Sequence, residues 1–574
     1  MDRPVVSAPM IENDHLRHQE ETSRHGLTTQ QKPYKKGGWN SAIFIIFMEM
    51  AERFAYQGLA SNLITYLTNV LHEPMGTAAK NVNTWTGISN IFPVLGAYIA
   101  DSFLGRFKTI LFAAVIFFMG MVLLTLAVSV VPLHYREALF FISLYILTVG
   151  EGGHKPCVQT FAADQFDENN PKERQAKTSF FNWWYLGIVF GGTAAMGVVY
   201  IQDNVGWGVG FGILAGANAF ALALFMIGIK RFRKKSPVGS PFTTVLQVIV
   251  AAARKWRVTD TRGGHGIFYD SEYPGQISGR TRQLRFLDKA MIMDDVDCSN
   301  ITRNPWRLCS LNQVEEVKLV IRLIPIWLSC LMFSAILVLV NTFYIKQGST
   351  MIRSIGPNFE MPPAGLLTLT GLTILITVFV YDRILVPLAR KFTGLPSGIS
   401  TLQRIGIGLF LSILNMSVAG LVEVKRIKIA REHGLLDSPQ AIVPMRIWWL
   451  LPQYIISGIA DVFTIVGLQE FFYYQVPEPM RSMGAAAYLS VTGAGSFVNS
   501  AIISIVQAIT SINGGEVWLG DNINRAHLHH FYWLLAGLSA LNLCVFVWIA
   551  KGFVYKTFVE DDMKEETGQS YDSY

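Results

Sequence analysis

The stretch FMEMAERFAYQG at residues 47–58 lies inside an apolar run that spans about residues 41–66. A run of this length can cross a bilayer as a helix. Each charged side chain that faces lipid near the middle of such a helix costs roughly 2.5–3.5 kcal/mol. Because this run carries three ionisable groups, we expect its charged face to look onto other helices or a water-filled cavity.

The spacing of the charged residues places them on one stripe of that helix. Glu49 and Glu52 are three residues apart, Glu49 and Arg53 are four apart, and Tyr56 extends the same face. Arg53 can hold one carboxylate as a fixed ion pair, whereas an acid without a full partner in a low dielectric favours its protonated form. The functional interpretation is a proton or ion relay, and the alternative is a structural ion pair that locks helix packing.

The composition is that of a membrane protein with many spans. Of 574 residues, 51% are hydrophobic and 16% are charged, whereas soluble domains carry about 25% charged residues. The net charge of +7 fits basic cytoplasmic loops better than nucleic-acid binding, because the positive residues lie beside apolar runs. The five cysteines lack the paired spacing of a metal site or disulfide framework, so we expect no metal site.

Twelve apolar segments are long enough to be membrane spans. They lie near residues 41–67, 84–104, 108–131, 138–163, 179–201, 208–229, 316–345, 363–386, 402–424, 446–474, 484–511 and 528–550. The predicted fold is therefore all-α, with twelve transmembrane helices in two six-helix halves. Such paired halves suit alternating access to a site between them.

The predicted organisation has five parts. They are a cytoplasmic N-terminal tail at 1–40, an N-terminal half at 41–229, a cytoplasmic linker at 230–314, a C-terminal half at 315–550 and a cytoplasmic tail at 551–574. The tail at 1–40 has no apolar segment typical of a signal peptide. Within the linker, Thr243 to Trp256 reads as an amphipathic helix that can lie on the inner membrane surface.

Basic residues favour a cytoplasmic N-terminus. Arg106, Lys108 and the KRFRKK cluster at 230–235 all fall in loops that this orientation places inside. One loop disagrees, because Lys425, Arg426, Lys428 and Arg431 would then lie outside.

Three motifs resemble those of known transporters. The loop DSFLGRFK at 101–108 resembles the loop signature of the major facilitator superfamily. The segment EMAERFAYQG at 49–58 resembles the first-helix motif of proton-coupled oligopeptide transporters, and FFNWW at 180–184 resembles their fifth-helix motif.

The resemblance is strongest to the plant nitrate and peptide transporter family, and it covers nearly all of 35–555. It rests on DQFD at 164–167, PEPMRSMG at 477–484, Trp518-Leu519 and NIN at 522–524, and on the long linker. It implies a proton-coupled symporter, not an enzyme, that moves nitrate, small peptides or another small organic solute by alternating access. It further implies a monomer in the bilayer, with protons as the coupling ion and no other cofactor. The sequence carries no readable address signal, and the plasma membrane and the vacuolar membrane both fit.

The resemblance also assigns roles to individual residues. Glu49, Glu52 and Arg53 would couple protons, and Lys155 in the fourth span would pair with Glu49 or Glu52. Lys155 follows three glycines, at 150, 152 and 153, that allow close helix approach. The alternative for this lysine is a side chain that snorkels from a helix end.

Three more residues are candidates for substrate binding or gating: Glu470, Tyr56 and Asn341. Glu470 matches an acid of the tenth span that can pair with Arg or Lys in one state, or it is a surface acid. Asn341 is an amide in an apolar helix and needs a hydrogen-bond partner. Some nitrate-moving relatives carry a histidine in the seventh span, where this chain has Leu337, which cannot hold an anion by charge.

Thr109 follows basic residues and resembles a phosphorylation position of the family, which implies a regulatory kinase as a partner. A second hypothesis is therefore a membrane sensor with weak transport that is regulated by phosphorylation. An enzyme or an ATP-driven pump is disfavoured, because the chain lacks both a His-Glu-x-x-His helix and a phosphate-binding Gly-x-x-x-x-Gly-Lys loop.

Overall fold

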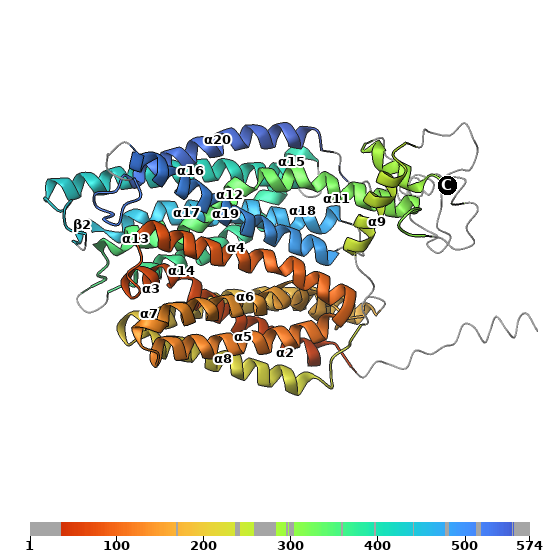
Figure 1. Ribbon diagram of the computed structural model, residues 1–574, viewed down its shortest axis with the longest axis horizontal. Coiled ribbons are helices and arrows are strands. Elements are labelled where there is room, and N and C mark those ends of the chain that lie inside the picture. The colour runs from red at the N-terminus through yellow and green to blue at the C-terminus, as the bar shows by residue number, and fades with distance from the viewer. Residues whose placement is uncertain are drawn as a thin grey trace, which may run out of the picture.

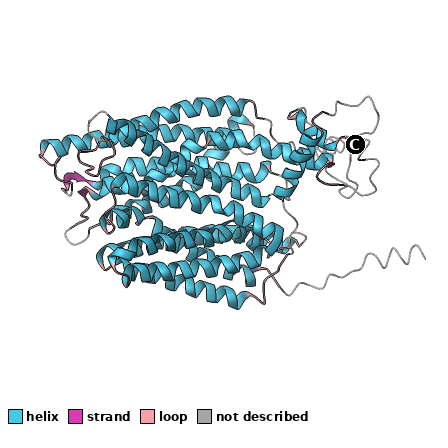
Figure 2. Ribbon diagram, viewed as in Figure 1, coloured by secondary structure: helices cyan, strands magenta, loops and turns pink. Residues whose placement is uncertain are grey.

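The computed structural model describes most of the chain as a bundle of long helices (Figure 1). The described residues are 36–167, 170–235, 241–257, 283–293, 297, 304–356, 360–394, 398–439, 441–476, 481–512, 518–553 and 555. The helices run side by side along the long axis of the bundle, and the short strands lie at one end of it (Figure 2).

The first half of the bundle forms the lower part of Figure 1. Its helices are α2 (Trp39–Ala60), α3 (Leu63–Asn69), α4 (Met75–Ile99) with the π-helical turn η1 (Ala100–Leu104), α5 (Arg106–Ser129), α6 (Leu133–Ala163), α7 (Pro171–Asn204) and α8 (Trp207–Gly228). The first predicted span is broken after Ala60, and α4 begins at Met75, nine residues before the predicted span at 84.

The second half begins after the linker helices α9 (Pro241–Arg254) and η2 (Arg285–Met291). It comprises α11 (Leu311–Ser329), α12 (Leu331–Leu337), η3 (Val338–Asn341), α13 (Phe343–Ser349), β1 (Met351–Ile352), η4 (Pro363–Leu366), α14 (Leu367–Val380), η5 (Tyr381–Leu385), α15 (Val386–Thr393), α16 (Thr401–Glu432), β2 (Val443–Arg446), η6 (Ile447–Leu450), α17 (Leu451–Asp461), η7 (Val462–Val466), α18 (Gly467–Gln475), α19 (Arg481–Ile512) and α20 (Leu528–Lys551). The strands β1 and β2 pair in parallel.

Ten of these helices or helix series are long and apolar enough to cross a membrane. Helices α2 and α6 also have the length of a span, but charged residues such as Glu52 and Glu151 interrupt their apolar stretches. Both helices pack within the same bundle. These two helices occupy the positions of the first and fourth predicted spans. The chain is an integral membrane protein with many spans.

The predicted amphipathic segment forms α9, which packs against protein on its apolar face. Val248, Ala251 and Ala252 are buried in a cluster with residues of η2 and α11, such as Leu287 and Val314. We call the end of the bundle near α9 the linker end and the opposite end, with α3, α13 and the strands, the distal end (Figure 1).

At the linker end, the 101–108 loop is tied to neighbouring segments by charge. Arg106 donates to the Asp164 carboxylate at 2.7 Å and lies 3.6 Å from Asp101. Lys235 bonds the other oxygen of Asp164 at 2.8 Å. These contacts give DSFLGRFK and DQFD a shared structural role, because they join the loop after η1, the end of α6 and the segment after α8.

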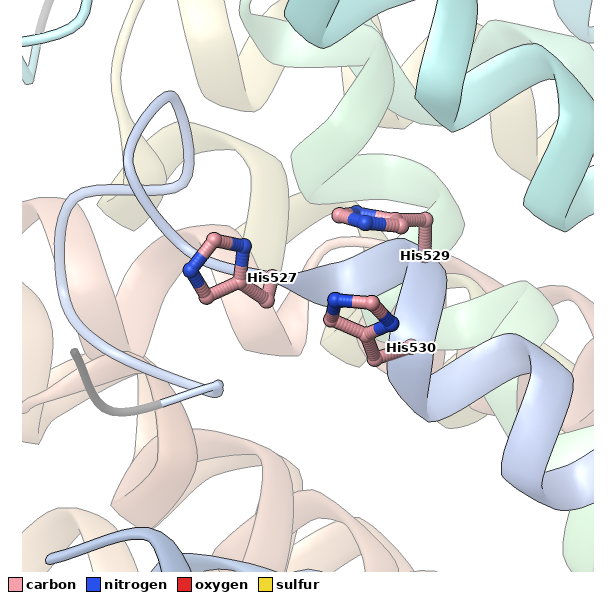
Figure 3. Close-up of side chains that lie close together, drawn as sticks. All are labelled: His527, His529 and His530. Carbon is pink, nitrogen blue, oxygen red and sulfur yellow. The ribbon is translucent and has the colours of Figure 1, made fainter. Parts of the chain in front are cut away.

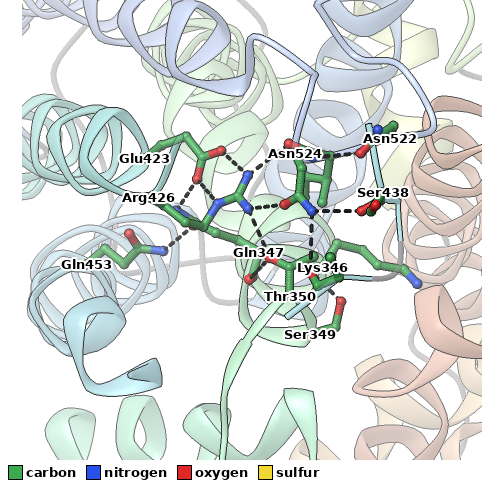
Figure 4. Close-up of polar contacts among 12 residues, drawn as sticks. Lys346, Gln347, Ser349, Thr350, Glu423, Arg426, Ser438, Gln453, Asn522 and Asn524 are labelled. Carbon is green, nitrogen blue, oxygen red and sulfur yellow. Dashed lines mark hydrogen bonds and ion pairs between the residues drawn. The ribbon is translucent and has the colours of Figure 1, made fainter. Parts of the chain in front are cut away.

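At the distal end, a buried polar network accounts for one of the four basic residues that disagreed with the predicted orientation (Figure 4). Helix α16 continues to Glu432, and Arg426 turns inward to a two-point ion pair with Glu423, at 2.6 and 2.8 Å. Arg426 also donates to Asn524 at 2.6 Å, and Gln347 donates to Glu423 at 2.6 Å. Arg426 is therefore not a loop charge, and the network ties α13 and α16 to the segment before α20.

The glycines of α6 bring it close to α4 and α5. A Cβ added at Gly96 of α4 would lie 1.9 Å from the carbonyl oxygen of Gly152, and one added at Gly153 would lie 2.8 Å from the Cβ of Ala113. This packing fixes α6 where it presents His154 and Lys155 to the interior.

We predict that Gly96→Ala destabilises the protein by about 1–3 kcal/mol, because the new methyl group meets backbone that cannot move without separating α4 from α6. Thermal unfolding in detergent measures the effect. Gly216→Ala is the matched control, since a Cβ there meets nothing within 4 Å. Equal unfolding temperatures for the two variants would contradict this close contact.

Candidate functional site

The charged stripe of α2 forms a buried cluster inside the first half. Arg53 donates from Nε to Glu49 Oε1 at 2.8 Å, and the same nitrogen lies 3.3 Å from Glu52 Oε2. Both acids are buried, with 2% and 3% of their surface exposed. The predicted face of the helix therefore does look inward, and Arg53 holds Glu49 more closely than Glu52.

Helix α6 supplies the other wall of the cluster, with a pairing that differs from the prediction. Lys155 Nζ donates to Glu151 Oε2 at 3.0 Å, one turn back on its own helix, and not to Glu49 or Glu52. The lysine also lies over the ring of Tyr56, 4.1 Å from its centre. An acid four residues away lies on the same face of the same helix, so this pair does not depend on how two helices pack. Glu151 therefore pairs with the lysine in this conformation.

His154 and Glu151 are site residues that the sequence reasoning missed. His154 Nε2 lies 3.3 Å from Glu49 Oε2, so Glu49 has partners from both α2 and α6. The signal for Glu151 was present in the sequence, since Glu151 and Lys155 share a helical stripe at i, i+4 spacing. The position of His154 depends on how α6 packs against α2, which the sequence does not state.

The cluster holds one carboxylate more than it holds fixed cations. Its acids are Glu49, Glu52 and Glu151 and its permanent cations are Arg53 and Lys155, which leaves a charge of −1 when all are ionised and His154 is neutral. Neither oxygen of Glu52 has a hydrogen-bond partner among the described residues. Glu52 is therefore the acid of the cluster with the fewest polar contacts, and its nearest cation is Arg53 at 3.3 Å.

Tyr56 and Asn341 are two of the candidates for substrate binding or gating, and they lie in α2 and η3. Tyr56 stacks on Trp85 of α4, with ring centres 5.4 Å apart. Asn341 lies in η3, and its side-chain oxygen is buried without a hydrogen-bond partner among the described residues. Leu337 ends α12 four residues earlier and offers no polar group at that position.

Glu470 pairs with Arg404 at 3.0 Å, as an acid with a basic partner, but both residues belong to the second half. Arg404 also donates to the carbonyl oxygen of Val462, which begins the π-helical turn η7. In this conformation the pair joins α16 to α18, and it does not bridge the two halves.

The two halves do meet through polar contacts at the distal end. Lys346 donates to Asn69 at 3.1 Å, and the backbone N–H of Met75 donates to Asp521 at 3.0 Å. A cavity of about 920 Å³ lies between these contacts, lined by residues of both halves that include Asp203 and Arg353.

Thr109 is buried in the structure, with 5% of its surface exposed. Its hydroxyl donates to the Gly105 carbonyl oxygen at 3.1 Å. A kinase cannot reach this hydroxyl unless α5 moves away from α6. The PEPM part of the predicted 477–484 motif and the side chains of Phe181 and Asn182 lie outside what the structure describes.

Comparison with known proteins places this site in a family. The POT family profile matches residues 107–519. The chain is 55% identical over 544 residues to Protein NRT1/PTR FAMILY 5.4 of Arabidopsis thaliana, covering 92% of this chain and 98% of that protein. It is 47% identical to Protein NRT1/PTR FAMILY 5.10 of the same plant, covering 91% of this chain and 94% of that protein.

Solved structures share the fold. The crystal structure of the POT family transporter PepTSo superposes with a TM-score of 0.68 at 21% identity, covering 89% of this chain and 98% of that one. An auto-inhibited POT family peptide transporter gives a TM-score of 0.66 at 20% identity, covering 90% and 98%. The predicted fold class is confirmed, and the chain is a transporter and not an enzyme. By sequence and by fold, the chain belongs to the POT family, among the plant NRT1/PTR proteins.

Proposed function

We propose that this protein is a proton-coupled symporter that moves a small solute across its membrane by alternating access. The observation that carries the proposal is the surplus buried carboxylate of Glu52, beside an arginine already held by Glu49. Buried ionisable groups inside a membrane bundle mark proton and substrate pathways more often than they mark packing.

Proton binding can move α2 against α6 by changing which carboxylate pairs with which cation. With Glu52 protonated, the remaining acids and cations match one to one, Glu49 with Arg53 and Glu151 with Lys155. When Glu52 loses its proton, its carboxylate competes for the two cations, and a change of partner shifts α2 against α6. The groups that face this exchange are Glu49, Arg53 and Tyr56 of α2, Glu151, His154 and Lys155 of α6, and Tyr488 of α19.

The substrate is a small solute of the kind that the relatives' names suggest, namely nitrate, a short peptide or another small organic molecule. Leu337 offers no charge to an anion, and both cations of the cluster already have carboxylate partners. These two facts favour an organic solute over nitrate. We propose that the protein lies in the plasma membrane or the vacuolar membrane, with its linker end facing the cytoplasm.

The sensor alternative receives less support from the structure. It rests on the long linker at 230–314 and on Thr109, whose buried hydroxyl donates to the Gly105 carbonyl oxygen just before α5. Regulation at this residue would need a conformation in which that contact opens.

A substrate panel in oocytes tests the proposed function. We expect greater uptake at an external pH of 5.5 than at 7.5 for one of nitrate, a dipeptide or a set of plant hormones, once surface delivery is confirmed. Acid-stimulated uptake of an organic solute without nitrate uptake would support the role given to Leu337. No acid-stimulated uptake of any solute by protein at the surface would contradict symport.

A further inference from the structure

Three histidines lie together where α20 begins, at the distal end of the bundle and away from the charged cluster (Figure 3). His527 precedes the helix, and His529 and His530 belong to its first turn. The ring centres are 5.7 Å apart for His527 and His529, 5.4 Å for His527 and His530, and 4.0 Å for His529 and His530. One ring nitrogen from each lies within 4.8 Å of the others.

The backbone that carries these rings is fixed on both sides. Leu528, between His527 and His529, is buried with 1% of its surface exposed. Upstream, Asn522 donates to the Leu436 carbonyl oxygen at 2.7 Å, and Asn524 accepts from Arg426 at 2.6 Å. The three imidazoles are therefore held close by the fold, and their proximity does not depend on a free loop.

The chemistry of the cluster favours a metal ion over other ligands. Imidazole is the commonest side-chain ligand of metals in proteins, and three imidazoles are gathered here. A tetrahedral zinc ion with three histidine ligands places the ring centres about 5 Å apart, close to the spacing here. His529 Nδ1 is buried and lacks a hydrogen-bond partner among the described residues, so this nitrogen is open to a ligand.

We propose that His527, His529 and His530 bind one divalent transition-metal ion of the zinc class. Modest rotation of the rings converges three nitrogens on the ion, and water fills the fourth position. His530 is exposed, which leaves a path for the ion from solution. A bound ion would add a further tie between α20 and the segment that carries Asp521, which contacts Met75 of the first half.

Zinc titration of the full chain tests the proposal without any assay of transport. The protein is purified in detergent with a tag that contains no histidine, and zinc binding is followed by calorimetry at pH 7.5. We expect one ion per chain, and an affinity at least about tenfold lower in His529→Ala/His530→Ala. His433→Ala is the matched control, because this exposed histidine lies at the same end, after α16, and should bind zinc as the wild type does.

Two further measurements protect the test against misfolding. His530→Ala alone changes only an exposed side chain and should also weaken binding. Cobalt added to the wild type should give the intense visible absorption of a tetrahedral site, and acidification to pH 5.5 should weaken binding as the imidazoles take up protons. Absence of zinc binding by the wild type, or equal affinity in the double variant, would overturn the proposal.

Discussion

Replacing Lys155 by alanine is expected to abolish acid-driven uptake. The lysine is buried, donates to Glu151 at 3.0 Å and lies over the ring of Tyr56. Its loss leaves Glu151 without its cation, and breaking a buried ion pair in this way costs roughly 3–5 kcal/mol. Uptake of the substrate found in the panel, at pH 5.5 and 7.5, measures the effect after correction for protein at the surface.

A second variant separates the loss of coupling from the loss of folding. Lys155→Ala/Glu151→Gln removes the unpaired acid together with the lysine, so it should regain surface delivery but not acid-driven uptake. Lys172→Ala, at an exposed position before the membrane-crossing part of α7, is the matched control. If Lys155→Ala takes up substrate as the wild type does, Lys155 is not needed for coupling, and the alternative of a snorkelling side chain is favoured.

Replacing Arg426 by alanine should have the largest effect on stability. Its guanidinium is fully buried and bonds Glu423, Asn524, Thr350 and the Ile523 carbonyl oxygen (Figure 4). The change leaves Glu423 as a buried charge without its ion-pair partner, at a cost of roughly 3–5 kcal/mol. We expect a lower unfolding temperature in detergent and little protein at the surface.

Lys428→Ala is the control for Arg426, because it removes an exposed positive charge two residues further along the same helix. A double variant, Glu423→Gln/Arg426→Ala, should recover part of the loss, since it no longer leaves a charge unpaired. If Arg426→Ala unfolds at the wild-type temperature, the network does not hold the distal end together.

The membrane fold and the charged face of α2 could be predicted from sequence because they depend on local features. The length of an apolar run predicts a single span, and the spacing of Glu49, Glu52 and Arg53 places them on one face of a single helix. The glycines before Lys155 predict only that their helix approaches a neighbour closely. The glycines do allow close helix approach as expected, here to α4 and α5, and the two acids are buried as expected.

Interaction partners that depend on how the helices pack could not be predicted from the sequence. Lys155 was expected to reach across to α2, but Glu151 on its own helix competes at lower cost. Arg426 was counted as a loop charge because the apolar run appears to end near 424, whereas α16 continues for two more turns and turns this side chain inward. Thr109 resembles a phosphorylation position in the sequence, and its burial beside Gly153 of α6 is visible only in the packed structure.

The most direct test of the central claim is the pH dependence of uptake in Glu52→Gln, with Glu432→Gln at an exposed site of α16 as control. The amide resembles a permanently protonated Glu52, so the account predicts that uptake at pH 5.5 and 7.5 becomes equal, while exchange of labelled substrate between the two sides persists. The control should keep the acid stimulation of the wild type. A Glu52→Gln protein that reaches the surface in normal amount and keeps the wild-type ratio between the two pH values would contradict the role of Glu52 as the coupling acid.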